Sequence, residues 1–148
     1  MRARKPLYRL MYVSHQVPDL PADVLAIAEN SKEFNAGLGV TGSLWFDGEN
    51  ILQFLEGDVD ALNTAFRRIQ KSHCHTDIDI ICFEKTETRI YNDWSQSYFG
   101  SQTHNRMVAE QFTGGPDMCL RSLPSSTMVD MLRFLEEERQ VDLARQVG

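Results

Sequence analysis

The segment Ile51-Leu52-Gln53-Phe54-Leu55-Glu56-Gly57 is an apolar run with one glutamine at its centre. Its length, its aromatic residue and the turn-forming residues at its ends predict a buried β-strand. Side chains alternate along a strand, so Gln53 shares a face with Ile51 and Leu55. An unsatisfied amide in a core costs about 1–3 kcal/mol. Gln53 therefore needs a partner, which is either another side chain or the polar edge of a ligand.

The sequence around this strand predicts an α+β fold. Strands are expected at 7–14, 40–46, 51–55, 78–83 and 94–99. Helices are expected after Pro21 and after Asp58, which suits an N-cap, and Asp47-Gly48 predicts a hairpin turn. The order β-α-β-β-α-β-β is a ferredoxin-like arrangement with one extra strand, and both helices should cover one sheet face. The strand at 78–83 is nearly continuous in apolar residues, which favours a central position.

The composition changes after Gly100. We expect residues 1–100 to form one domain and residues 101–148 to form a C-terminal helical extension. Its main helix is expected over Ser126–Arg139, because Met128, Met131, Leu132 and Leu135 recur at helical spacing. An extension of this kind cannot build a core alone, so it should pack on the free sheet face or on a partner chain.

Charge and composition exclude several classes of protein. The 148 residues carry a net charge of −6, which argues against a sequence-independent grip on nucleic acid. The sequence contains no apolar segment long enough to predict a membrane span or a secretory signal, so a cytoplasmic location is expected. Phosphate-loop, dinucleotide, nucleophile-elbow and zinc-protease motifs are missing, and the histidines and cysteines favour no metal site, so we do not expect an enzyme.

Three neutral hydrogen-bonding groups are expected to lie close together. Tyr12 faces inward on the first strand, which neighbours the third strand in this fold, so its hydroxyl can reach the Gln53 amide. Asn35 lies near the end of the first helix, one turn after Ser31. Taken singly, each has an ordinary structural interpretation, as a core hydrogen bond or a helix-end residue. Together, with no catalytic base beside them, they suit the imide edge of a planar heterocycle such as a flavin. Glu56 is expected to end its strand facing the second helix's N-terminus.

Several motifs resemble the BLUF family of bacterial blue-light sensors that bind a flavin. The resemblance covers about residues 7–99, in family order. It is carried by Leu10-Met11-Tyr12-Val13-Ser14, Asn30-Ser31-Lys32-Glu33-Phe34-Asn35, Val40-Thr41-Gly42-Ser43-Leu44, Gln53-Phe54-Leu55-Glu56-Gly57, His75 and Asn92-Asp93-Trp94.

The resemblance implies a non-covalent FAD between the two helices, with FMN and riboflavin as alternative flavins. Tyr12 would donate an electron and a proton under light, and Gln53 would then rotate or tautomerise. Asn35 would bind the O4/N3 edge of the ring, with Ser31 and His75 near the flavin. Trp94 would belong to the photoactive set and to the signal relay.

One position departs from the family pattern. The family usually has methionine two residues after the tryptophan, whereas this chain has Gln96. Gln96 shares a strand face with Trp94 and could offer Gln53 a polar partner. We therefore predict altered dark-recovery kinetics, and a Gln96→Met variant that recovers at the wild-type rate would contradict this.

The resemblance implies a short photoreceptor that signals through contacts with a downstream protein. Apolar residues expected to be exposed on the C-terminal extension suggest self-association as well. Two alternatives remain at this level. One is a flavin- or small-molecule-binding module that does not respond to light. The other is a small ferredoxin-like enzyme such as an acyl-phosphate hydrolase, for which the sequence lacks an arginine-bearing phosphate loop.

Overall fold

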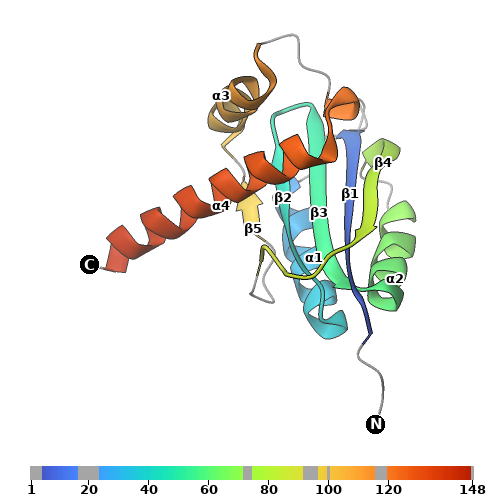
Figure 1. Ribbon diagram of the computed structural model, residues 1–148. Coiled ribbons are helices and arrows are strands. Elements are labelled where there is room, and N and C mark those ends of the chain that lie inside the picture. Colours follow the sequence, from blue (N-terminus) through green and yellow to red (C-terminus); the bar gives the residue numbers. More distant parts are fainter. Residues whose placement is uncertain are drawn as a thin grey trace.

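A mixed β-sheet lies at the centre of the chain (Figure 1). The computed structural model describes residues 5–16, 24–71, 75–91, 97–99, 101–115 and 120–147. The strands are β1 (Leu7–Gln16), β2 (Thr41–Phe46), β3 (Asn50–Asp58), β4 (His75–Lys85) and β5 (Ser97–Phe99), in the spatial order β4-β1-β3-β2-β5. Neighbouring strands are antiparallel, except that β5 runs parallel to β2.

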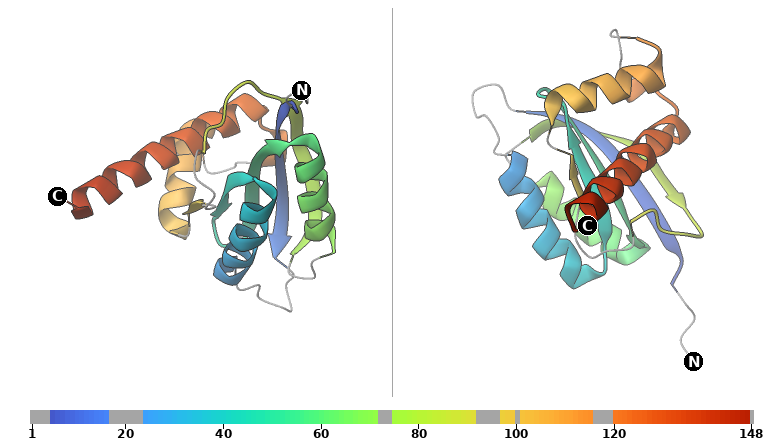
Figure 2. Two further views of the ribbon diagram at one scale, coloured as in Figure 1. Left: turned by 90° about the horizontal axis from the view of Figure 1, so that it is seen from below. Right: turned by 90° about the vertical axis from the view of Figure 1, so that its left-hand side faces the viewer.

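Helices cover both faces of the sheet. α1 (Val24–Leu38) and α2 (Val59–Gln70) lie on one face, as predicted, while α3 (Gln102–Thr113), the short turn η1 (Leu120–Ser122) and α4 (Ser125–Val147) follow β5. Figure 2 shows α4 on the face opposite α1 and α2. The ferredoxin-like α+β prediction is therefore confirmed, with a C-terminal helix added on the second sheet face.

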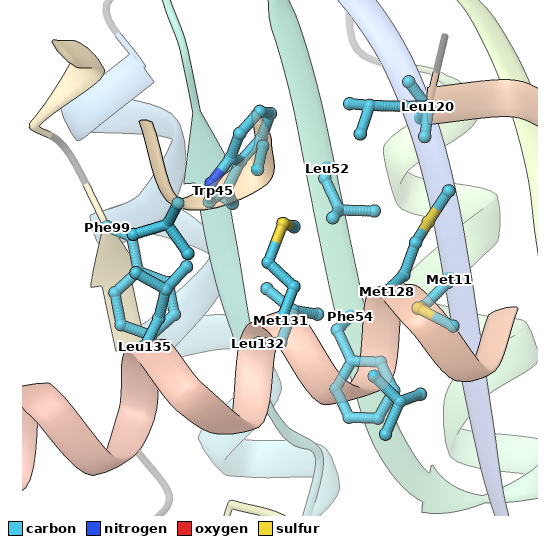
Figure 3. Packing of buried hydrophobic residues seen from close by; sticks show 14 of the residues in the cluster. Met11, Trp45, Leu52, Phe54, Phe99, Leu120, Met128, Met131, Leu132 and Leu135 are labelled. Atoms are coloured by element: carbon cyan, nitrogen blue, oxygen red, sulfur yellow. The ribbon is translucent and has the colours of Figure 1, made fainter. Parts of the chain in front are cut away.

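The central strands β1, β2 and β3 are buried on both faces because they alternate two apolar sets. On the α1/α2 face, Leu10 and Leu55 pack with residues of α2, and Leu44 and Ile51 pack with Ala28 of α1. The larger cluster on the opposite face joins the sheet to α3 and α4 (Figure 3). Its best-buried members are Met11, Val13, Trp45, Leu52, Phe54, Ala109, Met128 and Leu132.

Local signals set the boundaries of several elements. The Asp58 carboxylate accepts a hydrogen bond from the Ala61 backbone N–H at 2.8 Å and caps α2, as its sequence position predicted. The β2–β3 hairpin turns at Asp47 and Gly48. The φ angle of Gly48 is 102°, a conformation that glycine adopts without steric cost.

Three sequence expectations are corrected. The strand expected at the centre, β4, lies at the sheet edge, where Ile80 is 52% exposed and Phe83 42% exposed. An apolar run therefore did not distinguish an edge strand from a central one; Phe83 instead packs on Tyr8, with ring centroids 5.4 Å apart. The expected helix 126–139 extends to Val147, and α3 was not predicted.

α3 was missed because few of its residues are apolar and buried. Its inner side is Asn105, Val108 and Ala109. The Asn105 side-chain amide donates to the backbone carbonyl oxygens of Phe46, at 2.7 Å, and of Phe99. A buried polar residue thus docks α3 where a sequence pattern would call for an apolar one.

Candidate functional site

Tyr12 and Gln53 face each other across the centre of the sheet. They are directly paired in the β1–β3 register, and both are buried beneath the helical face. The Tyr12 hydroxyl donates a hydrogen bond to Gln53 Oε1. Burial raises the pKa of the Tyr12 phenol far above its usual value, so the donor proton stays on the oxygen at any ordinary pH. The predicted contact between these two residues is therefore present.

The other end of the Gln53 amide is unmatched by the described residues. Gln53 is fully buried, yet its Nε2 has no hydrogen-bond partner among them. A buried amide with one end satisfied and the other free costs about 1–3 kcal/mol. An acceptor on the edge of a ligand would satisfy this donor.

α1 and α2 form the walls beside this pair. Asn35 of α1 is buried at 4% exposure, and its side-chain amide makes no hydrogen bond to another described residue, while Ser31 one turn earlier is half-buried. The Phe66 ring of α2 lies 6.0 Å from that of Tyr12. The Arg68 guanidinium of α2 lies 4.1 Å from the centre of the Phe34 ring, which links the two helices by a cation–π contact.

A polar clamp holds the segment after β4 against the ends of β2 and β3. The buried Glu56 carboxylate accepts hydrogen bonds from the backbone N–H groups of Ile90 and Tyr91 at 2.8–3.0 Å. The Arg89 guanidinium donates to Thr41 Oγ1 at 2.8 Å and to the Glu56 backbone carbonyl at 3.0 Å. Glu56 therefore fixes a loop and does not face α2's N-terminus, which corrects the sequence expectation.

The clamp makes stability depend on pH. Burial raises the pKa of Glu56, although the backbone donors and Arg89 offset part of the effect. An acid whose folded-state pKa is raised supports folding fully below its unfolded pKa, and this support is lost as pH rises through the folded value. We expect wild type to lose stability relative to Glu56→Gln over that range. Urea unfolding of both proteins from pH 4 to 8 measures it. The exposed Glu87→Gln is the control, and parallel curves for Glu56→Gln and wild type would contradict the prediction.

Other predicted site residues are only partly described. His75 begins β4, opposite Gln16 in the β1 register, but its side chain lies outside the described residues. Trp94 and Gln96 lie outside them altogether, so the proposed relay and the recovery prediction for Gln96 stay predictions.

Sequence reasoning missed the arginines that fasten the surrounding segments. Arg89 contacts residues 33 to 50 positions away in the chain, and Arg121 contacts residues up to 108 positions away. No local periodicity marks such residues. A lone arginine in a connecting segment was the available signal, and it is not a specific one.

A ferredoxin-like sheet that carries a buried Tyr–Gln pair is the arrangement that the sequence resemblance to blue-light sensors predicted. Residues 7–97 match the family model described as BLUF, sensors of blue-light using FAD. The match spans more than half of the chain, so the chain belongs to the BLUF family. No curated protein matches it.

Solved structures of the same family resemble the chain along most of its length. BlrB, described as a BLUF protein in its dark state, is 26% identical with a TM-score of 0.73, over 87% of this chain and 96% of that one. BlsA in its photo-activated state is 25% identical with a TM-score of 0.74, over 87% and 94%.

A longer protein resembles only part of the chain. BlrP1 from Klebsiella pneumoniae, solved with FMN and cyclic diGMP, is 30% identical with a TM-score of 0.58, over 63% of this chain. The chain spans about a quarter of the length of that protein.

The residues at the site fit a flavin. Gln53 Nε2 lacks an acceptor among the described residues, and Asn35 presents a buried amide with both a donor and an acceptor. The edge of a flavin ring offers acceptors and one N–H donor, which complements this set.

No described helix is long and apolar enough to cross a membrane.

Proposed function

We propose that this chain is a blue-light photoreceptor that binds FAD between α1 and α2 and switches through Tyr12 and Gln53. The observation that carries the proposal is the buried hydrogen bond from Tyr12 to Gln53 Oε1, with Gln53 Nε2 left for the flavin edge. Asn35 would hold the ring in register, with Ser31 and His75 beside it. The family description supports FAD as the flavin.

The chemistry depends on the amide. A flavin held beside Gln53 and Asn35 would supply the blue-light absorption and the acceptor for an electron and a proton. Tyr12 would supply both, and its hydroxyl would then stop acting as a simple donor to Gln53. The two ends of the Gln53 amide have similar shape and opposite hydrogen-bonding roles, so rotation or tautomerisation inverts the pattern with little change in packing. Return of the electron and proton to Tyr12 leaves the new hydrogen-bond pattern in place.

Absorption spectroscopy of the purified protein tests the proposal. We expect the bound flavin to show a small, reversible red shift under blue light that decays in the dark. Chromatography of the released flavin distinguishes FAD from FMN and riboflavin. A yellow protein whose spectrum does not shift would instead select the light-insensitive binding module, and a colourless protein would overturn flavin binding.

The outer half of α4 is proposed to be the output surface, and a second copy of this chain its occupant. α4 extends past β5 and away from the sheet (Figure 1). Val141 is 50% exposed and Leu143 42% exposed on this part. Glu137 and Arg145 lie one turn before and one turn after Val141. Two α4 helices packed antiparallel about Val141 would place each Glu137 opposite the other copy's Arg145, which is an isologous contact.

Charge reversal tests this pairing. We expect wild type to dimerise weakly, because so short a helix pair buries less than a standard interface. Glu137→Arg should weaken the dimer by about fivefold, roughly the value of 1 kcal/mol of lost and repulsive ion pairing. The double variant Glu137→Arg/Arg145→Glu should restore it. Sedimentation over a concentration series, dark and lit, measures each protein.

Asp130→Arg is the control for charge, since Asp130 is exposed on the inner half of α4. A dimer that the double variant does not restore would overturn the antiparallel register. A monomer at all concentrations, in both dark and light, would leave a different downstream protein as the output partner.

The division of the chain into two parts at residue 100 and the cytoplasmic location stay predictions.

A further inference from the structure

β4 carries two bulges opposite β1, one on each side of the pair Tyr12 and Val13. Met11 pairs with Cys82 but Tyr12 pairs with Ile80, so one residue of β4 is extra. Val13 pairs with Asp79 but His15 pairs with Thr76, so two residues of β4 oppose one of β1. In the second bulge Asp77 adopts φ 54°, which is costly for a non-glycine residue. The ladder beside the photoactive tyrosine is therefore interrupted twice.

Arg121 fills the second bulge. Its guanidinium donates to the Asp77 backbone carbonyl at 2.6 Å and approaches the Val13 carbonyl at 3.5 Å. It also lies 3.0 Å from His15 Nε2 and pairs with the Asp79 carboxylate. Arginine cannot accept a hydrogen bond, so His15 Nε2 accepts here. The Arg121 side chain thus links β1 and β4 at the position where the regular pairing of the two strands is interrupted.

This arginine belongs to the segment that starts the C-terminal helix. It lies in η1, drawn in orange beside the ends of β1 and β4 in Figure 1. Leu120 before it is 3% exposed and belongs to the core cluster that includes Met128 of α4. A change in the spacing of β1 and β4 at Val13 would therefore act directly on the point from which α4 starts.

We propose that Arg121 is a positioning residue that couples the Tyr12–Gln53 site to α4. Tyr12 precedes Val13 directly, so rearrangement at Tyr12 shifts the backbone that Arg121 grips. Loss of that grip releases η1 and the first turns of α4 from the β1–β4 edge. The inference rests on the proposed photoreceptor function and adds the route by which the switch reaches the output surface.

Hydrogen exchange on the full flavin-loaded chain tests the coupling. In wild type, residues 120–135 should exchange at least about tenfold faster in light than in the dark, the change expected on losing one hydrogen bond to a charged group. Arg121→Met keeps an unbranched apolar stem and removes every donor. Its dark rate should equal the lit wild-type rate, with no further change in light and with the flavin red shift retained.

Two further variants keep the result interpretable. Arg133→Met, on an exposed α4 position, should behave as wild type. Asp79→Asn removes one partner of Arg121 and should raise the dark rate in the same direction by a smaller factor, which covers the case that Arg121→Met fails to fold. A light-dependent change that survives in Arg121→Met or Asp79→Asn at full size would overturn the proposal. A wild type with a red shift and no change at 120–135 overturns the coupling alone, whereas no red shift overturns the photoreceptor function with it.

Discussion

Tyr12→Phe is expected to abolish the blue-light red shift while leaving the flavin bound. The phenol is the donor to Gln53 Oε1 and the proposed source of the electron and proton, and phenylalanine supplies neither. The ring itself still packs beside Phe66, so the site should keep its shape. Loss of the donor leaves Gln53 Oε1 unsatisfied in the core, which should lower the free energy of unfolding by about 1–3 kcal/mol.

Difference absorption spectra before and after blue light measure the result. Two matched variants remove the same hydroxyl elsewhere. Tyr8 lies on the same strand as Tyr12, and Tyr91 lies in the core cluster of the opposite face. The variants Tyr8→Phe and Tyr91→Phe should both keep the red shift. A full red shift in Tyr12→Phe would show that another group is the donor.

Gly42→Ala is expected to prevent folding or to cost at least about 3 kcal/mol. A Cβ on Gly42 would overlap the backbone carbonyl oxygen of Phe54 and lie 3.0 Å from its carbonyl carbon. The obstacle is the backbone of β3, so no rotamer change relieves it. Separation of β2 from β3 is the only relief, and it would displace Gln53, so flavin binding should fall with stability.

Gly37→Ala is the matched control, because its added Cβ meets nothing within 4 Å. Gly37 lies in α1, where alanine is the better helix former by up to about 1 kcal/mol. Thermal unfolding and flavin retention of both variants give the comparison. A Gly42→Ala protein as stable and as yellow as Gly37→Ala would show that β2 and β3 tolerate a wider spacing.

The part of the site that follows from alternation was predictable from the sequence. Gln53 stands on an apolar strand, and a period of two together with the fold order places it opposite Tyr12. The N-cap at Asp58 was predictable for a different reason, because its partner, the Ala61 N–H, is only three residues away. Interactions that follow from a short sequence repeat, or from a known order of strands, can therefore be predicted from the nearby sequence.

The contacts that were not predicted join distant segments without a repeating pattern. Glu56 binds backbone groups 34 and 35 residues later, and nothing in the sequence near Glu56 distinguishes a loop from a helix terminus as its partner. β4 was misplaced because its apolar residues suit a central strand and an edge strand equally well. Asn105 in α3 shows the converse, since a polar side chain docks a helix into the core.

The alternation of β1 and β3 also bears on how such a sensor can diverge. Tyr12 and Gln53 occupy one set of alternate positions, whereas Met11, Val13, Leu52 and Phe54 occupy the other and contact the α3/α4 side. The composition of the two sides can therefore drift separately, since a substitution on one side leaves the other untouched. A displacement of the strands on one side of the sheet must also displace the other side, because both sides share one backbone. Replacement of the helices on the α3/α4 side would therefore leave the backbone link between the two sides of the sheet in place.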